Sequence, residues 1–286
     1  LIFIMLITLA TTVTVSYSSH HQTISDSYAL LKVGSVTSVS MYKYPVDGEY
    51  LIVLGSMTVN SSGQEVYHAI VVTVGSKGTE ILYNITEPYP VYSVAICPKY
   101  FAVGLGTSQC SCTAILRVYS TISGELLWCV KFPYNIQCRI DSVDDIKIAC
   151  NEIIATATSE IYGYPYGNLS AFNASNGKLL WFFTIHNMSP EPTYMSLSYV
   201  CVHNCYVVAS AGNGYATGGW VFLFNTHDGK LLWINSSLGD PYAGPPVFSG
   251  NGKYIVVSSS VINDYSGVYV LSTCTGSVIW SNTSYS

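Results

Sequence analysis

Short apolar segments recur along the chain, and each is bounded by Gly, Asn, Asp or Ser. The segments are rich in Val, Ile, Tyr and Phe, and beyond residue 20 none keeps an apolar period of 3.6 residues. This pattern predicts strands joined by tight turns, in which Gly, Asn and Asp accept positive φ or bond the local backbone. We therefore expect an all-β chain.

Two sets of segments repeat with the same period. The first set consists of VYSTISGELLW, AFNASNGKLLW, LFNTHDGKLLW and VLSTCTGSVIW, which end at Trp128, Trp181, Trp233 and Trp280, with a poorer copy ending at Tyr83. The second set precedes these and includes GEYLIVLGS, PKYFAVGLG and GKYIVVSSS. A repeat of roughly 50 residues with four antiparallel strands is the period of a propeller blade. We predict a β-propeller of about five four-stranded blades.

The segment AFNASNGKLLW resembles A-x-(D/N)-x-x-T-G-x-x-x-W, the tryptophan-docking motif of PQQ-type (quinoprotein alcohol dehydrogenase-like) β-propellers. The resemblance spans about residues 36–281. It implies that Trp128, Trp181, Trp233 and Trp280 pack against neighbouring blades. It also implies that the glycine four residues before each tryptophan forms the turn into the outermost strand. Enzymes of the family have eight blades, whereas five are visible here. A small closed propeller is our first expectation, and an open stack completed by a neighbour is the second.

Residues 1–17, LIFIMLITLATTVTVSY, contain no charge. The segment resembles the N-terminus of an archaeal type IV pilin, whose apolar helix is buried in a filament core after transient membrane insertion. Val13, Val15 and Tyr17 alternate with polar residues, which favours a strand donated to a neighbouring subunit as the alternative to a helix. An uncleaved signal and a short membrane anchor also remain open. We divide the chain into an N-terminal assembly or anchor segment, 1–27, and a propeller domain, 28–286.

Charged residues make up only 9% of the chain, hydrophobic residues make up 49%, and the net charge is −5. The hydrophobicity excludes intrinsic disorder. The absence of a basic stripe excludes nucleic acid as a partner. After residue 17 no apolar run approaches membrane length, which excludes a multispan membrane protein. Ser, Thr, Asn, Tyr and attached sugar are expected to keep the surface soluble.

Seven asparagines stand in N-x-Ser/Thr sequons, more than composition alone would produce, and ordinary turn asparagines are the alternative interpretation. They are Asn60, Asn84, Asn168, Asn173, Asn187, Asn235 and Asn282. Three of them directly follow an expected outermost strand, so N-linked glycans there would coat the rim and cover strand edges.

Nine cysteines indicate an oxidising compartment, although their spacing does not give a connectivity. The disulfide candidates are Cys97, Cys110, Cys112, Cys129, Cys138, Cys150, Cys201 and Cys205. A metal site on Cys201, His203 and Cys205 is the less favoured reading, because no fourth ligand lies nearby in sequence.

A quinoprotein dehydrogenase requires a carboxylate base, calcium and often a vicinal disulfide, as the resemblance implies. The chain has no Cys-Cys pair, and its six histidines form no HExxH motif. The acidic cluster Asp141, Asp144, Asp145 and Glu152 has the ligand chemistry of calcium, but a solvated acidic loop is the preferred interpretation. We predict no catalytic, cofactor-binding or metal-binding residues.

Together these features predict a secreted, glycosylated, non-enzymatic subunit of an extracellular filament or pilus-like surface assembly of archaeal type, with an adhesive role. Residues 1–17 would join the copies into a homopolymer. The alternative is a membrane-anchored propeller that binds a small ligand or redox cofactor, or that acts as an envelope scaffold.

Overall fold

The computed structural model describes residues 12–17, 27–45, 48–76, 78–106, 114–132, 142–149, 151–161, 164–185, 196–212, 220–238, 245–261 and 265–285. Within these ranges every regular element longer than a single turn is a β-strand, and none is an α-helix. The all-β prediction is therefore confirmed. No helix long and apolar enough to cross a membrane occurs in the described ranges.

Five antiparallel sheets follow one another along the chain, each built from four consecutive strands. The first contains β3 (Ser35–Lys43), β4 (Tyr50–Val59), β5 (Glu65–Gly75) and β6 (Gly78–Glu87). The second contains β7 (Val91–Ile96), β8 (Tyr100–Leu105), β9 (Ile115–Ser120) and β10 (Leu126–Lys131). The third contains β11 (Ser142–Ala149), β12 (Glu152–Ile161), β13 (Tyr164–Asn173) and β14 (Leu179–Thr184).

The fourth sheet contains β15 (Ser196–His203), β16 (Tyr206–Gly212), β17 (Trp220–Asn225) and β18 (Leu231–Asn235). The fifth contains β19 (Val247–Phe248), β20 (Tyr254–Val261), β21 (Tyr265–Ser272) and β22 (Val278–Tyr285). The prediction of five four-stranded blades is thus confirmed.

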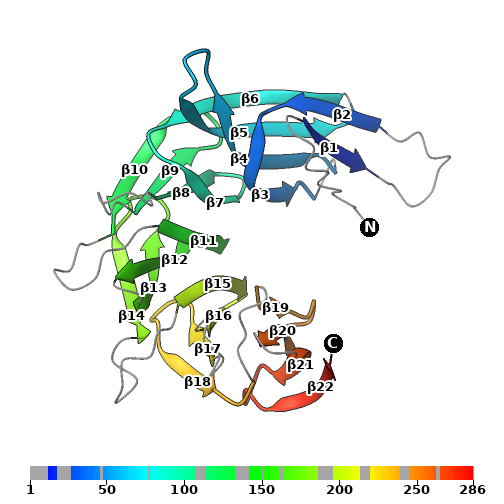
Figure 1. Ribbon diagram of the computed structural model, residues 1–286, viewed down its shortest axis with the longest axis vertical. Coiled ribbons are helices and arrows are strands. Elements are labelled where there is room, and N and C mark those ends of the chain that lie inside the picture. Colours follow the sequence, from blue (N-terminus) through cyan, green and yellow to red (C-terminus); the bar gives the residue numbers. More distant parts are fainter. Residues whose placement is uncertain are drawn as a thin grey trace.

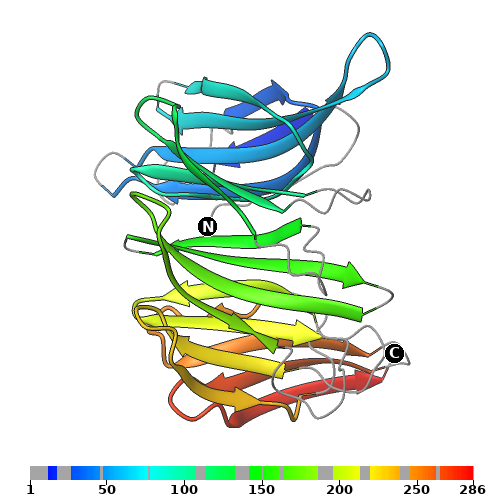
Figure 2. The ribbon, with the colours of Figure 1, turned by 90° about the vertical axis from the view of Figure 1, so that its left-hand side faces the viewer.

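The five sheets are arranged as successive blades along an arc (Figure 1). The first strand of each sheet lies on the inner side of the arc and the fourth strand on the outer side. The side view shows the sheets stacked one after another from the first to the fifth (Figure 2). The first and fifth sheets stand at the two ends of the arc and share no strand among the described residues. The arrangement is the open one, not the closed ring that was our first expectation.

A separate two-stranded sheet precedes the blades. β1 (Thr12–Tyr17) pairs antiparallel with β2 (Ser27–Lys32), and β2 lies next to β6 at the end of the first blade (Figure 1). Residues 12–17 therefore form the strand that was the alternative to a helix, but this strand pairs within its own chain and is not donated to a neighbouring subunit. Residues 1–11, the rest of the expected apolar segment, lie outside the described residues.

Apolar side chains fill each space between neighbouring sheets. Because the inner blades are covered on both faces, their central strands are apolar at consecutive positions, as in Val207–Val208 and Val221–Phe224 of the fourth blade. The cluster between the third and fourth sheets, for example, joins Ile154 and Trp181 to Phe222 and Phe224. Equivalent clusters lie between the other neighbouring sheets. The hydrophobic core is therefore divided into layers between the blades.

The face of the first sheet that points away from the second is also buried. Ile52, Leu54, Ile70 and Val72 on this face have exposed fractions of 3% or less, and Val33, which follows β2, belongs to the same cluster. Gly34 fits against β4 so closely that a Cβ atom would lie 2.3 Å from the Met57 carbonyl oxygen. The chain leaving the N-terminal hairpin is thus packed onto this end of the arc.

Candidate functional site

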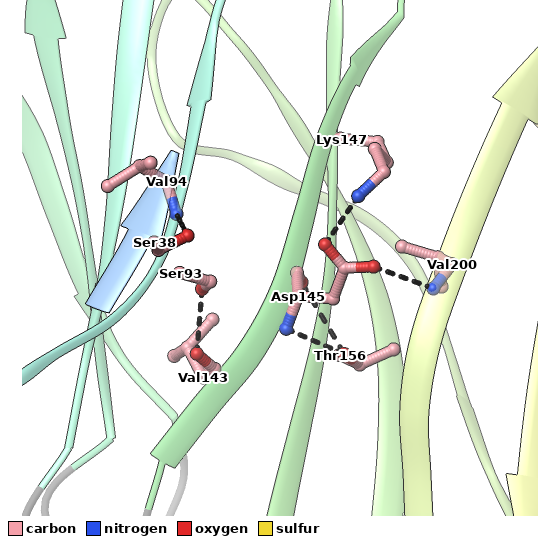
Figure 3. Close-up of polar contacts among 8 residues, drawn as sticks. All are labelled: Ser38, Ser93, Val94, Val143, Asp145, Lys147, Thr156 and Val200. Carbon is pink, nitrogen blue, oxygen red and sulfur yellow. Dashed lines mark hydrogen bonds and ion pairs between the residues drawn. The ribbon is translucent and has the colours of Figure 1, made fainter. Parts of the chain in front are cut away.

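Polar side chains on the inner strands link each of the first three blades to the next one (Figure 3). Ser38 Oγ accepts a hydrogen bond from the Val94 amide at 3.2 Å, and Ser93 Oγ donates to the Val143 carbonyl at 2.7 Å. Asp145 Oδ2 accepts from the Val200 amide at 2.9 Å. Each of these side chains stands directly after a β-bulge in its strand. Since a bulge redirects a side chain, the same irregularity aims all three toward the neighbouring blade.

Asp145 is the charged member of this series. Its Oδ1 atom forms an ion pair with Lys147 Nζ at 2.5 Å, and its amide donates to Thr156 Oγ1 at 3.1 Å. Both carboxylate oxygens are therefore engaged, one by a cation and one by the backbone of the next blade. The Asp145 side chain is only 14% exposed. This geometry makes Asp145 a connection between blades.

The structure separates the acidic residues that were considered for calcium. Asp144 accepts hydrogen bonds from Ser142 and Thr158, while Glu152 Oε1 lies 3.0 Å from Nδ1 of His227 in the fourth blade. Asp141 lies outside the described residues. No group of three or more His, Cys, Asp or Glu side chains suited to a metal ion occurs in the part of the chain that is described.

A buried charged group joins the first two blades and was missed by the sequence reasoning. Glu87, at the end of β6, forms an ion pair with Arg117 Nη1 at 3.0 Å and accepts a hydrogen bond from the Tyr119 hydroxyl at 2.6 Å. Burial raises the pKa of Glu87, although the hydrogen bonds and the Arg117 charge oppose this shift. Burial and the bond to Glu87 raise the pKa of Tyr119. In the sequence, this buried group is indicated by the single charge of Arg117 inside the apolar strand ILRVYS.

A second series of contacts lies near the outer rim, where an aromatic ring of one blade rests on a glycine turn of the next. The indole N–H groups of Trp128, Trp181 and Trp233 donate to the carbonyls of Ala174, Thr226 and Thr273 at 2.8, 2.6 and 2.8 Å. In each case the acceptor precedes the turn glycine by three residues. Tyr83 makes the related contact from the first blade, because its hydroxyl donates to the Ile122 carbonyl at 2.6 Å.

The glycines in these turns are required by both conformation and space. Gly177, Gly229 and Gly276 have φ values of 70°, 66° and 70°, in the left-handed region. A Cβ atom on Gly229 would lie 2.5 Å from the Trp181 ring. Trp280, the fourth tryptophan of the motif, has no following blade among the described residues and is 53% exposed.

The candidate cysteines and sequons fall into several environments. Cys97, Cys129, Cys201 and Cys205 have free thiols, while Cys110, Cys112, Cys138 and Cys150 lie outside the described residues, as does Asn187. Asn60, Asn84 and Asn282 are exposed, and Asn168 and Asn173 are half-buried. Asn235 is half-buried, and its Nδ2 atom, the site of glycan attachment, donates to the Gly276 carbonyl of the next blade at 2.6 Å.

The repeated four-stranded sheets and their aromatic contacts define a β-propeller of the PQQ-like repeat class. Residues 113–286 match the family PQQ_2, described as outer membrane protein assembly factor BamB, and the chain belongs to this family. The resemblance recognised in the tryptophan motif is therefore confirmed. No curated protein matches the chain.

Several solved structures share this fold. A europium-containing methanol dehydrogenase has a TM-score of 0.56 and 11% identity, over 80% of this chain and 49% of its own. Hydrazine synthase of Kuenenia stuttgartiensis has a TM-score of 0.57 and 12% identity, over 89% and 67%. Sqt1 of Saccharomyces cerevisiae has a TM-score of 0.54 and 13% identity, over 87% and 75%. The chain spans about half or less of the dehydrogenases it matches. At these identities the likeness shows the fold alone.

Proposed function

We propose that the protein is a secreted, glycosylated, non-enzymatic structural subunit of an extracellular filament or pilus-like surface assembly. In this proposal the propeller is the exposed, adhesive body and residues 1–17 join one copy to the next. The assembly would lie at the cell surface.

The structural role is supported by the contacts of the two carboxylates that could have acted chemically, those of Asp145 and Glu87. Asp145 binds Lys147 and the Val200 amide, and Glu87 binds Arg117 and Tyr119. Both carboxylates thus serve contacts between blades and are occupied by protein partners. A general base or a calcium ligand needs oxygen atoms that are open to a substrate or an ion. These contacts favour a scaffold over a catalyst.

Three exposed sequons support the glycoprotein part of the proposal. Asn84 and Asn282 lie on the outermost strands β6 and β22, and Asn60 lies in the turn between β4 and β5. The Asn60 turn is closed by hydrogen bonds from the Ser62 and Gln64 amides to Asn60 Oδ1, and Asn60 Nδ2 donates to the exposed Gln64 Oε1 at 3.4 Å, so the amide lies in an exposed loop. Glycans at Asn60 and Asn84 would cover the β4–β5 turn and part of the edge strand β6.

Electron microscopy of the native protein, purified without detergent, tests the assembly. We expect regular filaments from the intact chain and discrete particles after removal of residues 1–11, a deletion that keeps β1 and its pairing with β2. Phe182→Ser, which changes an exposed side chain remote from the N-terminus, is a matched control. Discrete particles from the intact chain would contradict the filament proposal.

The family match favours a second candidate, a scaffold in an envelope assembly. A partner that co-purifies at fixed stoichiometry would support this function. The absorbance of a bound quinone, or melting that depends on calcium, would instead support a propeller that binds a redox cofactor.

A further inference from the structure

The last blade exposes a continuous apolar face on the side that points away from the fourth blade. Val247 pairs with Val256, Val256 with Val270, and Val270 with Trp280, so one row of side chains crosses all four strands of this blade. Val268 lies on the same face, two residues from Val270. We call this set, Val247, Val256, Val268, Val270 and Trp280, the Trp280 face. Its members Val247 and Trp280 are 52% and 53% exposed.

The equivalent row is covered in every other blade. In the fourth blade it comprises Cys201, Val208, Leu223 and Trp233, and it packs against Phe248, Ile255 and Leu271 of the fifth blade. In the third blade it includes Ile154, Ala171 and Trp181, which pack against the fourth blade. The Trp280 face is thus a copy of an interface that the molecule builds four times, without its second half.

The two ends of the arc differ. At the first blade, Ile52, Leu54 and Val72 are buried beneath the chain that follows the N-terminal hairpin. In stacked repeat proteins the terminal units need a cover or a polar outer surface to stay soluble. The Trp280 face has neither in the described structure, so it is the end at which association would bury most apolar area.

We propose that the Trp280 face binds the Trp280 face of a second copy of this chain, in a two-fold symmetric dimer. The four strands β19 to β22 contain no Asp, Glu, Lys or Arg, so two copies can meet without bringing like charges together. In a head-to-tail contact, Trp280 would need a free glycine turn on another copy. The turns at Gly124, Gly177, Gly229 and Gly276 already hold aromatic rings of their own chain. The first blade has only a short Gly75–Gly78 hairpin and a covered face.

A head-to-tail contact would therefore have to displace the N-terminal hairpin, whereas a two-fold contact displaces nothing. Closed two-fold dimers are the commonest assembly of identical chains, and the same patch then serves both subunits. One face of a four-stranded sheet is smaller than the about 800 Å2 that each partner gives to a standard interface. We expect an association that varies with concentration over the micromolar range.

Sedimentation velocity of the chain without residues 1–11, made in a bacterial host without N-linked glycosylation, tests the dimer, because the intact chain is expected to form filaments. We expect a shift from monomer to dimer between about 1 and about 200 μM, and at least a tenfold weaker association for Trp280→Ser. Val268→Asp, which places a charge on the same face, should have the same effect. Both side chains are more than 40% exposed, so the variants should melt at the wild-type temperature.

Phe182→Ser is the matched control, because Phe182 is an aromatic residue of an outermost strand and is 67% exposed, but lies outside the Trp280 face. It should dimerise like the wild type. Size distributions that are the same for wild type and Trp280→Ser, whether monomeric or polymeric, would overturn the proposal. An open-ended series of larger species that Trp280→Ser abolishes would also overturn it, because that result indicates head-to-tail contact. The filament proposal is tested separately, by electron microscopy of the intact chain and of the chain without residues 1–11.

Discussion

The indole N–H of Trp181 donates to the backbone carbonyl of Thr226, 2.6 Å away, across the boundary between the third and fourth blades. The same ring covers Gly229, three residues after the acceptor. This pair shows how one repeat fixes the next, because the ring supplies apolar contact while the hydrogen bond fixes its orientation. The residues are 45 positions apart, close to the length of one repeat.

Trp181→Phe should lower the free energy of unfolding by about 1 to 3 kcal/mol, since it leaves the Thr226 carbonyl without its donor but keeps most of the ring. Trp181→Ala should cost about 3 to 5 kcal/mol, because it also leaves a cavity. Urea unfolding followed by circular dichroism measures both values. Trp280→Phe is the control and should change stability by less than about 0.5 kcal/mol. Equal losses at positions 181 and 280 would show that the inter-blade contact is not the source of the effect.

Gly229→Ala should destabilise the chain more than Gly48→Ala. Both glycines have positive φ, 66° and 72°, so both variants carry the conformational cost of about 1 to 2 kcal/mol. Only at Gly229 would the new Cβ meet the Trp181 ring, at 2.5 Å, whereas nothing lies within 4 Å of a Cβ at Gly48. The difference between the two melting temperatures measures the cost of moving the ring. If the two variants melt together, the ring moves aside without loss.

The buried Glu87 predicts a dependence of stability on pH. Because its pKa in the folded chain is raised above the ordinary 4.5, the folded chain binds this proton more tightly than the unfolded chain. The contribution of Glu87 is therefore greatest below pH 4.5 and falls as the pH rises through the folded pKa. The free energy of unfolding of the wild type, minus that of Glu87→Gln, should decrease from about pH 4 to about pH 7. A difference that increases over this interval would mean that Arg117 and Tyr119 outweigh burial and hold the pKa below 4.5.

Asp145→Ala should lower the free energy of unfolding by about 1 to 3 kcal/mol, because the amide of the fully buried Val200 would lose its acceptor. Asp228→Ala is a suitable control, since Asp228 is exposed and its side chain bonds only a nearby turn amide. Calcium should not raise the melting temperature of the wild type, because Lys147 and Val200 already occupy the carboxylate. Stabilisation by calcium that disappears in Asp145→Ala would instead identify a metal site.

Mass spectrometry of peptides from the native protein should find glycan at Asn60 and Asn84 and none at Asn235. Asn60 and Asn84 are exposed, whereas Asn235 Nδ2 is bonded to the Gly276 carbonyl in the contact between the last two blades. A glycan at Asn235 would indicate that this contact is not formed when sugar is attached. Asn282 shares a sheet face with Trp280, so a glycan there would prevent the two-fold dimer.

The period, the strands and the glycine turns could be predicted from local sequence patterns, because strand alternation, tight turns and positive φ depend on residues that are close together in the chain. The sequence also identified the tryptophans of the outer rim through their constant spacing from those glycines. The same local reasoning offered a strand at Val13, Val15 and Tyr17 as the alternative to a helix. Each of these features repeats, and a repeated pattern can be recognised without knowing how the units are placed in space.

The contacts between groups that are far apart in the sequence became visible in the folded chain. Glu87 and Arg117 are 30 positions apart and belong to different blades, so neither segment alone indicates the pair. The bulge before Asp145 turns its carboxylate toward Val200, whereas the sequence showed only an acidic cluster. The exposure of Trp280 likewise follows from the place of the last blade at the end of an open arc, because its local sequence is that of the tryptophans that are covered.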